Sequence, residues 1–282
     1  MSTIKELLDY GKEILENSGN EYAKYERKVL LEHVTGYNYM YMLMNADEEL
    51  SPDKTDEYKR LLEKRALHYP LQYILGYTHF MDYTFLVNEN VLIPRSDTEI
   101  LVESVNDLFA KNILTEDDCK ILDLCCGSGC IGISLKLYHN KTDLTLSDIF
   151  DKAIEVARSN LHKYSINANC NIGDLWEGID GTFDLIVCNP PYIKSSIIPT
   201  LMPEVKEYEP VLALDGGEDG IIYYKRVIDK AKEYLNKKGF LFFEIGYDQG
   251  DSVSGLMKKA GFQNVAVIKD YAQLDRVVCG HL

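Results

Sequence analysis

The chain has 282 residues, of which 46% are hydrophobic and 27% charged. This composition is ordinary for a globular protein, and the length predicts one large domain with a smaller one. The 30 basic and 45 acidic residues give a net charge of −15. That balance disfavours nucleic acid as the main partner, because binding to phosphates depends on basic residues.

Cysteine and histidine usage predicts reduced thiols and no metal site. The seven cysteines form no two Cys-x-x-Cys pairs, and the six histidines show no ligand spacing. The N-terminal segment is charged throughout, and no apolar run is long enough to span a bilayer. We therefore expect a cytoplasmic protein, monomeric and without a membrane partner.

Residues 1–76 predict a small helical domain. Thr3 and Glu6 have the spacing of a capping box for a first helix, a second helix follows, and Ser51-Pro52 suits the start of a third. Such a unit has too little core to carry chemistry of its own. We interpret it as a recognition domain for the substrate.

Residues 77–96 predict a β-hairpin that links the two domains. Aromatic and β-branched residues appear from Phe80, and the polar run Asn88–Asn90 leads into the apolar run Val91–Ile93. This pattern predicts a hairpin that turns at Asn88–Asn90.

Residues 97–282 form the predicted α/β domain. From Lys120 onward strand-like and helix-like runs alternate, which indicates a parallel sheet with helices on both faces. The last two strand-like runs, Val265–Ile268 and Val277–Cys279, are joined only by a loop. We expect them to pair antiparallel at one edge of the sheet.

A tight glycine turn joins a strand to a helix between Ile121 and Gly132. Gly127 and Gly129 allow a ligand to approach the backbone, and Asp148, at the end of the next strand, can accept hydrogen bonds from two ribose hydroxyls. This combination predicts an adenosine-containing cofactor. Cys125 stands where the first glycine of such turns often falls, and we expect it to be extended, with no positive φ.

Acidic residues refine the identity of the cofactor. Asp123 lies in the strand just before the turn, where a carboxylate repels a pyrophosphate and favours the sulfonium and ammonium groups of S-adenosylmethionine. The alternative for Asp123 is a structural cap on the helix. Asp174 follows a third strand, and it is either a loop residue or an acceptor for the adenine amine. Leu175 and Trp176 beside it can flank the ring, although Trp176 suits the core equally.

The sharpest signal is Asn189-Pro190-Pro191-Tyr192 at the end of an apolar strand. Two prolines stiffen the backbone and remove two donors. The Asn189 side-chain oxygen and the Pro190 carbonyl can then accept both hydrogens of an amide or amino-purine NH₂ group. They hold its nitrogen in line with a methyl donor as positive charge develops. Tyr192 is predicted to supply an aromatic wall for the planar group and the sulfonium.

These motifs resemble those of the HemK/PrmC family of protein glutamine methyltransferases. Further segments strengthen the resemblance, which covers nearly the whole chain; they are Pro70–Gly76, Val91–Arg95 with Thr98-Glu99, Tyr208–Gly220 and Asp270–Val278. The resemblance implies a class I S-adenosylmethionine-dependent methyltransferase (Rossmann-like) domain with a small N-terminal helical domain and a β-hairpin linker. It also implies methylation of the glutamine in the Gly-Gly-Gln motif of peptide chain release factors, with S-adenosylhomocysteine as the second product.

The residue roles follow by position. The predicted catalytic residues are Asn189, Pro190 and Tyr192. The predicted cofactor site comprises Asp123, Cys125, Cys126, Gly127, Ser128, Gly129, Asp148, Asp174, Leu175 and Asn189. The predicted substrate site comprises Asn189, Pro190, Pro191, Tyr192, Pro94, Arg95, Thr98 and Glu99. Arg95 and Glu99 suit a surface ion pair equally well, and Ser96-Asp97 replaces the Pro-Glu that is common in the family.

Three alternative functions remain open on the sequence. One acceptor is a glutamine of a large-subunit ribosomal protein. Another is an amino group of a DNA or RNA base, which the same corner chemistry serves, although the net charge and the small helical N-terminal domain disfavour it. The third alternative is a non-catalytic module that binds a translation factor, which the intact Asn189–Tyr192 motif disfavours.

Overall fold

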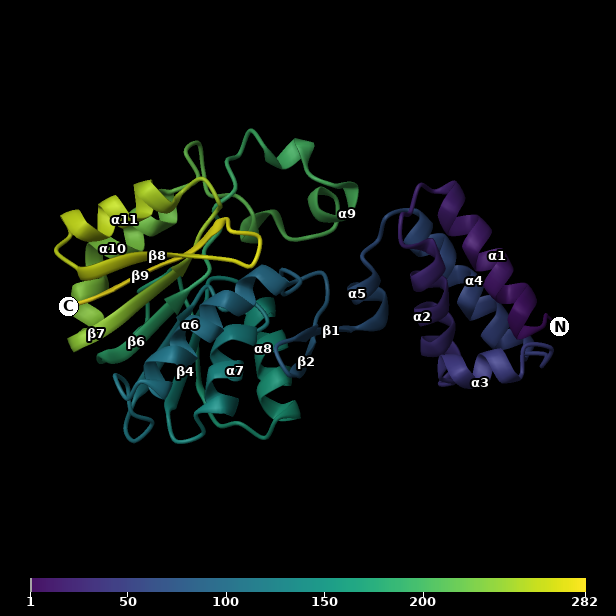
Figure 1. Cartoon of the computed structure of the whole chain (residues 1–282), viewed down its shortest axis with the longest axis horizontal. Coiled ribbons are helices and arrows are strands. Elements are labelled where there is room, and N and C mark those ends of the chain that lie inside the picture. Colours follow the sequence, from purple (N-terminus) through teal and green to yellow (C-terminus); the bar gives the residue numbers. More distant parts are fainter. Residues whose placement is uncertain (1) are drawn as a thin grey trace. The chain divides into compact units, whose positions relative to one another are not determined.

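A computed structural model describes residues 2–282 of the chain (Figure 1). Met1, the first residue of the predicted helical domain, lies outside the described residues. The chain divides into a helical unit, which ends at Gly76 but regains Met202–Tyr208, and a sheet unit, made of Tyr77–Leu201 and Glu209–Leu282. We call Met202–Tyr208 the returning segment. The predicted linker 77–96 thus packs within the sheet unit.

The helical unit is built from short amphipathic helices around a leucine-rich core. Thr3 and Glu6 form the expected capping box, with hydrogen bonds of 2.9 and 3.2 Å, and Ser51 accepts from the Lys54 N–H at the start of the fourth helix. Buried leucines of four helices form one core cluster together with Tyr58. The helices are α1 (Ile4–Asn17), α2 (Ala23–Thr35), α3 (Tyr39–Met44), α4 (Pro52–Ala66), α5 (Leu71–Leu75) and, in the returning segment, α9 (Pro203–Lys206).

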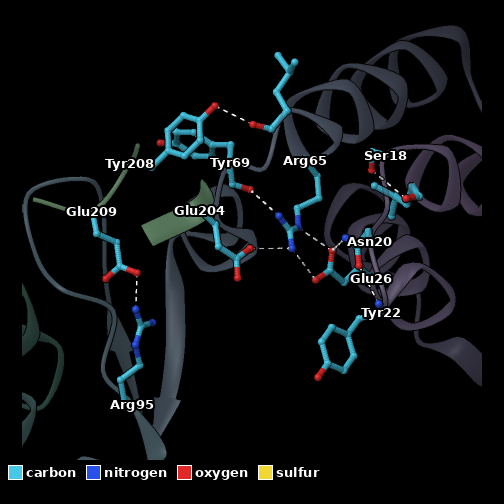
Figure 2. Close-up of polar contacts among 12 residues, drawn as sticks. Ser18, Asn20, Tyr22, Glu26, Arg65, Tyr69, Arg95, Glu204, Tyr208 and Glu209 are labelled. Carbon is cyan, nitrogen blue, oxygen red and sulfur yellow. Dashed lines mark hydrogen bonds and ion pairs between the residues drawn. The ribbon is translucent and has the colours of Figure 1, made fainter. Parts of the chain in front are cut away.

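A buried ion-pair network holds the returning segment in the helical unit (Figure 2). The Arg65 Nε and Nη2 atoms donate to the two carboxylate oxygens of Glu26 at 2.6 and 3.1 Å. Arg65 Nη2 also lies 3.0 Å from Glu204 of α9. In addition, the Tyr208 hydroxyl donates to the Leu67 carbonyl at 2.8 Å. These contacts combine charge-assisted hydrogen bonds, which are stronger than neutral ones, with a neutral one.

The hairpin begins the sheet unit, but it closes earlier than the sequence suggests. Strand β1 (Tyr77–Phe80) pairs antiparallel with β2 (Tyr83–Leu86) through a turn at Met81-Asp82. Met81 has φ 52°, and its N–H donates to Glu99 Oε1 at 2.5 Å. The predicted turn at Asn88–Asn90 is therefore wrong as the hairpin turn, and Val91–Ile93 is not a strand.

The large sheet has seven strands in the order β5-β4-β3-β6-β7-β9-β8. The strands from β5 to β7 are parallel, and β9 pairs antiparallel with both β7 and β8. The expected antiparallel edge is thus confirmed. The strands are β3 (Lys120–Leu124), β4 (Asp143–Asp148), β5 (Asn169–Ile172), β6 (Phe183–Cys188), β7 (Leu235–Glu244), β8 (Gln263–Lys269) and β9 (Asp275–His281).

Helices cover both faces of this sheet, as Figure 1 shows. Successive strand residues point to opposite faces, so Ile121 of β3 packs with α6, α7 and α8 whereas Leu122 packs with α10 and α11. Strands covered on both faces have near-continuous apolar runs, which explains why they were readable in the sequence. The helices are α6 (Glu99–Ala110), α7 (Cys130–Tyr138), α8 (Asp151–Lys163), α10 (Ile222–Tyr234) and α11 (Gly250–Lys259), with 3₁₀ turns at Ser96–Thr98, Ile198–Thr200 and Val211–Ala213.

Because they run parallel, the strands β3, β4, β5 and β6 have their carboxyl ends on the same side of the sheet unit. Ligands of open α/β sheets bind at these carboxyl ends. Over residues 2–282, none of the helices combines the length and the apolar character needed to cross a bilayer.

Candidate active site

The glycine turn follows β3 and combines three residues with positive φ. Cys125, Gly127 and Gly129 have φ values of 57°, 53° and 77°. The expectation of an extended Cys125 is therefore wrong, because the chain reverses directly after Leu124 and a cysteine takes a conformation that glycine adopts more easily. Around Gly127 nothing lies within 4 Å of the place that a Cβ would occupy, so its backbone is accessible to a ligand.

Gly129 serves the packing beneath the turn. A Cβ at this position would lie 2.9 Å from the Ile133 side chain and 3.1 Å from that of Leu146. Because both neighbours belong to the buried core, this glycine allows α7 to begin close against β4. Unlike Cys125, Cys126, Gly127 and Ser128, Gly129 does not line the cavity described below.

Asp148 ends β4 beside the turn. Its Oδ2 accepts from the Gly127 N–H at 2.9 Å and its Oδ1 from the Phe150 N–H at 3.0 Å. Burial raises the pKa of this carboxyl, and these backbone donors act in the opposite direction. Each oxygen keeps a second lone pair, so the carboxylate can still accept from two ribose hydroxyls.

Asp123 takes the structural alternative. Its side chain is fully buried and absent from the cavity wall, and its Oδ2 accepts from the Gly132 N–H at 2.8 Å in the first turn of α7. Burial raises its pKa to about 7. The predicted direct contact of Asp123 with the cofactor is therefore not what the structure shows, since the carboxylate points under the turn to cap the helix.

The residues after β5 divide between the cavity and the core. Asp174 and Leu175 line the cavity, and Asp174 Oδ2 accepts from Arg226 Nη2 at 2.7 Å. Trp176 does not flank this space. Its ring stacks on Tyr234 with centroids 4.4 Å apart, and its side chain is buried among the residues under α10. The core interpretation of Trp176 is thus the correct one.

The proline corner places two of its four residues on the cavity wall. Asn189 and Pro191 line the cavity, whereas Pro190 and Tyr192 do not. The Tyr192 hydroxyl donates to Glu244 Oε1 at 3.2 Å, and burial raises the pKa of this phenol well above its usual range. The structure thus turns Tyr192 away from the wall that the sequence assigned to it, because a buried acceptor holds its hydroxyl.

The rim of the cavity comes from the segment between the hairpin and α6. Pro94, Arg95 and Thr98 line it, but Glu99 faces the hairpin turn instead. Arg95 pairs with Glu209 and not with Glu99 (Figure 2). The alternative pairing of Glu99 with Arg95 is therefore wrong, and the contact of Glu99 with the substrate stays a prediction.

These parts surround a single cavity with about 990 Å³ of empty space, part of it open to solvent. This volume suits a small-molecule cofactor site. Its wall holds the carboxylates of Asp148 and Asp174 but only one basic side chain, Arg95, which is itself paired. Such a wall favours a ligand with positive charge and disfavours a pyrophosphate. Apolar side chains complete it, among them Ile131, Phe150, Ala153, Leu175, Leu212 and Tyr223.

Comparison with known proteins decides the family. A family model described as PrmC N-terminal domain matches residues 6–76, and one described as methyltransferase small domain matches residues 99–202. The chain is 39% identical to a release factor glutamine methyltransferase of Clostridium botulinum, over 98% of each chain. The chain belongs to the release factor glutamine methyltransferase family.

Other comparisons agree with this assignment. A release factor glutamine methyltransferase of Geobacter sulfurreducens is 36% identical over 99% of this chain and 97% of its own length. A methyltransferase from Pyrococcus furiosus shares the fold with a TM-score of 0.53 and 16% identity, covering 80% of this chain and 98% of that one. The predicted family, the α/β class I methyltransferase fold and the methyltransferase class of enzyme are confirmed.

Sequence reasoning missed several residues that shape this member of the family. Glu209 is 4% exposed, accepts from the Ile93 N–H at 3.2 Å and pairs with Arg95 at the rim. Glu244 contacts the hydroxyl of Tyr192, and Gln249 contacts its carbonyl. Glu244 ends an apolar strand, so the strand-end rule that found Asp148 could also have found it. No group of three or more potential metal ligands occurs between residues 2 and 282.

Proposed function

We propose that the chain transfers the methyl group of S-adenosylmethionine to the side-chain amide nitrogen of the glutamine in the Gly-Gly-Gln motif of peptide chain release factors. One observation carries this proposal. The glycine turn with Asp148 and the corner residue Asn189 line the same cavity, so a cofactor and an amide acceptor can meet there. Relatives that cover almost the whole chain are named as release factor glutamine methyltransferases.

The cofactor side of the cavity is formed by the glycine turn and the two acids. When bound, S-adenosylmethionine supplies an electrophilic methyl group on a sulfonium. Asp148 is assigned the ribose hydroxyls, Asp174 and Leu175 the adenine, and the accessible backbone around Gly127 the remainder. The acidic wall suits the positive charge of this cofactor.

The acceptor side is formed by the proline corner. An amide NH₂ group is a poor nucleophile because its lone pair is delocalised. The Asn189 side-chain oxygen would accept one hydrogen and orient the nitrogen. The Pro190 carbonyl is proposed as the acceptor of the other hydrogen, although Pro190 does not itself line the cavity. These hydrogen bonds strengthen as charge develops on that nitrogen, which is the condition for catalysis rather than mere binding.

The rim residues Pro94, Arg95 and Thr98 are assigned to the protein substrate, and the helical unit to its recognition. The cytoplasmic location and the monomeric state stay predictions. The net charge of −15 argues against a nucleic-acid acceptor.

Mass spectrometry of a release factor incubated with enzyme and S-adenosylmethionine tests the proposal. We expect the mass gain of one methylene group, confined to the motif glutamine. A release factor with glutamate at that position is the matched control and should gain nothing. Methylation of a large-subunit ribosomal protein or of duplex DNA in parallel reactions, with the release factor unchanged, would replace the proposed acceptor.

A further inference from the structure

A buried glutamine lies beneath the proline corner. Gln249 is 5% exposed and sits just before α11. Its Nε2 donates to the Tyr192 carbonyl at 3.0 Å and to the Gly220 carbonyl at 3.1 Å. Its Oε1 accepts from the Gly246 N–H at 2.9 Å and lies 3.3 Å from the Tyr224 hydroxyl, which donates to the Glu244 carbonyl at 2.9 Å. The amide therefore uses both N–H donors and accepts a backbone N–H at its oxygen, so its orientation is fixed.

Gly216 and Gly220 allow the 216–220 loop to pack directly against the backbone of Tyr192. A Cβ on Gly216 would lie 2.7 Å from the Tyr192 Cα and carbonyl carbon. A Cβ on Gly220 would lie 2.6 Å from the Tyr192 carbonyl oxygen. These separations are too short for any side chain, so the backbone of Tyr192 is confined between Gln249 and the 216–220 loop.

Glu244 holds the other end of the tyrosine. It ends β7, the parallel neighbour of β6, and is 2% exposed. Its Oε1 accepts from the Tyr192 hydroxyl at 3.2 Å, and the Thr98 side chain is a second hydrogen-bonding neighbour of this carboxyl. Burial raises the pKa of this carboxyl, and the Thr98 hydrogen bond and the positive charge of Arg276 act against that shift. A buried carboxylate needs hydrogen-bond donors, so Glu244 and the Tyr192 hydroxyl fix each other's position.

We propose that Gln249 and Glu244 are positioning residues that fix Tyr192 at its carbonyl and its hydroxyl, and thereby fix where Asn189 presents its amide oxygen. Neither residue lines the cavity, so neither touches cofactor or acceptor. Their effect passes through the corner, in which only Pro190 and Pro191 separate Asn189 from Tyr192. The inference rests on the proposed function, because it assigns the role of this corner in methyl transfer.

The substitution Gln249→Glu tests the contact between Gln249 and the Tyr192 carbonyl. It keeps the size of the side chain and the Oε1 acceptor but replaces the two Nε2 donors by an oxygen that repels both carbonyls. A displacement of the corner by about 1 Å should lower kcat on the order of 100-fold. The affinity for S-adenosylmethionine should remain unchanged, because the glycine turn and Asp148 are not disturbed. Gln263→Glu, the same change on an exposed residue of β8, is the matched control.

The substitutions Glu244→Leu and Glu244→Gln test the contact between Glu244 and the Tyr192 hydroxyl. The leucine variant should lose kcat, and the glutamine variant should recover most of it, because its amide oxygen can still accept from Tyr192. Thermal unfolding of every variant separates lost fold from lost positioning. Normal kcat in folded Gln249→Glu or in Glu244→Leu would overturn the proposal. So would a cofactor affinity that falls in parallel with kcat.

Hydrogen–deuterium exchange of the peptide that covers residues 189–195 makes the two proposals separable. Faster exchange there in Gln249→Glu than in wild type and Gln263→Glu supports the positioning role, whichever acceptor the enzyme uses. Unchanged exchange contradicts it. A wild-type enzyme that leaves the release factor unmethylated contradicts only the proposed function.

Discussion

Asp148 at the end of β4 accepts a 2.9 Å hydrogen bond from the backbone of Gly127 in the turn after β3. One carboxylate therefore both shapes the turn and faces the cavity. Asp148→Ala should raise the dissociation constant of S-adenosylmethionine at least about tenfold, because a hydrogen bond to a charged group contributes about 1.5–3 kcal/mol. Isothermal titration calorimetry measures this change. Asp148→Asn keeps one acceptor and should be intermediate, and wild-type affinity in the alanine variant would contradict the assignment.

Asn189→Ala should separate chemistry from cofactor binding. Removal of the amide oxygen leaves the acceptor nitrogen with one fewer partner in the transition state, so we expect kcat to fall on the order of 100-fold or more. Because Asn189 also lines the cofactor cavity, binding of S-adenosylhomocysteine, measured on the same sample, should weaken far less than kcat falls. Turnover that survives this substitution would falsify the proposed role of the corner.

Asp123 predicts a specific dependence of stability on pH. Its pKa is raised to about 7 in the folded chain from an ordinary 3.8, so the folded state holds a proton that the unfolded state has lost. Its contribution to stability is thus fully present below about pH 4 and is lost as the pH rises toward 7. The slope attributable to this group is at most about 1.4 kcal/mol per pH unit.

Urea denaturation across this pH range compares wild type with Asp123→Asn. The asparagine can still accept from the Gly132 N–H but does not titrate. The difference in unfolding free energy, wild type minus variant, should therefore fall between pH 4 and 7 and then level off. A difference that stays constant with pH would show that Asp123 titrates normally.

The ion pair between Arg95 and Glu209 at the rim of the cavity gives a prediction about the protein substrate. Glu209→Ala frees Arg95 and removes the acceptor of the Ile93 N–H, so the rim segment loses two fixed points. We expect the KM for the release factor to rise about tenfold, which corresponds to 1.4 kcal/mol, with little change in kcat. Steady-state kinetics with varied release factor measure this. Glu207→Ala, an exposed neighbour, should behave as wild type.

The buried network of the helical unit should respond strongly to loss of one partner. Arg65→Met leaves the Glu26 carboxylate buried without its bidentate partner, which should cost about 3–5 kcal/mol of unfolding free energy. The double variant Glu26→Met with Arg65→Met should recover much of that loss. Arg60→Met, on the exposed side of the same helix, should change stability by less than about 0.5 kcal/mol. Equal effects at the two arginines would contradict the network's role.

The sequence was most informative where local pattern and position coincide. Apolar runs with glycine, proline or acid at their ends predicted the parallel strands, the turn at Gly127, the acid Asp148 and the corner at Asn189. The turn, the acid and the corner lie together at the carboxyl ends of the strands, because parallel strands share their direction. Such features need only a few neighbouring residues to be recognised.

The errors have two physical sources. Met81 and Cys125 adopt positive φ, although nothing in their side chains favours that region, so both the hairpin turn and the first turn residue were misjudged. The contacts of Tyr192 with Glu244 and Gln249 join residues 52 and 57 positions apart. No local periodicity encodes such pairs, and they emerge only when β6 and β7 lie side by side.

The chain passes between its two units three times, after Gly76, after Leu201 and after Tyr208. A fragment that starts at Tyr77 would therefore keep the returning segment but lose everything on which it rests, since Glu204 would lack Arg65 and Tyr208 would lack the ring of Tyr69. Domain swaps between relatives face the same constraint. A chimera that is meant to inherit another member's helices must exchange two separate stretches of sequence, not one.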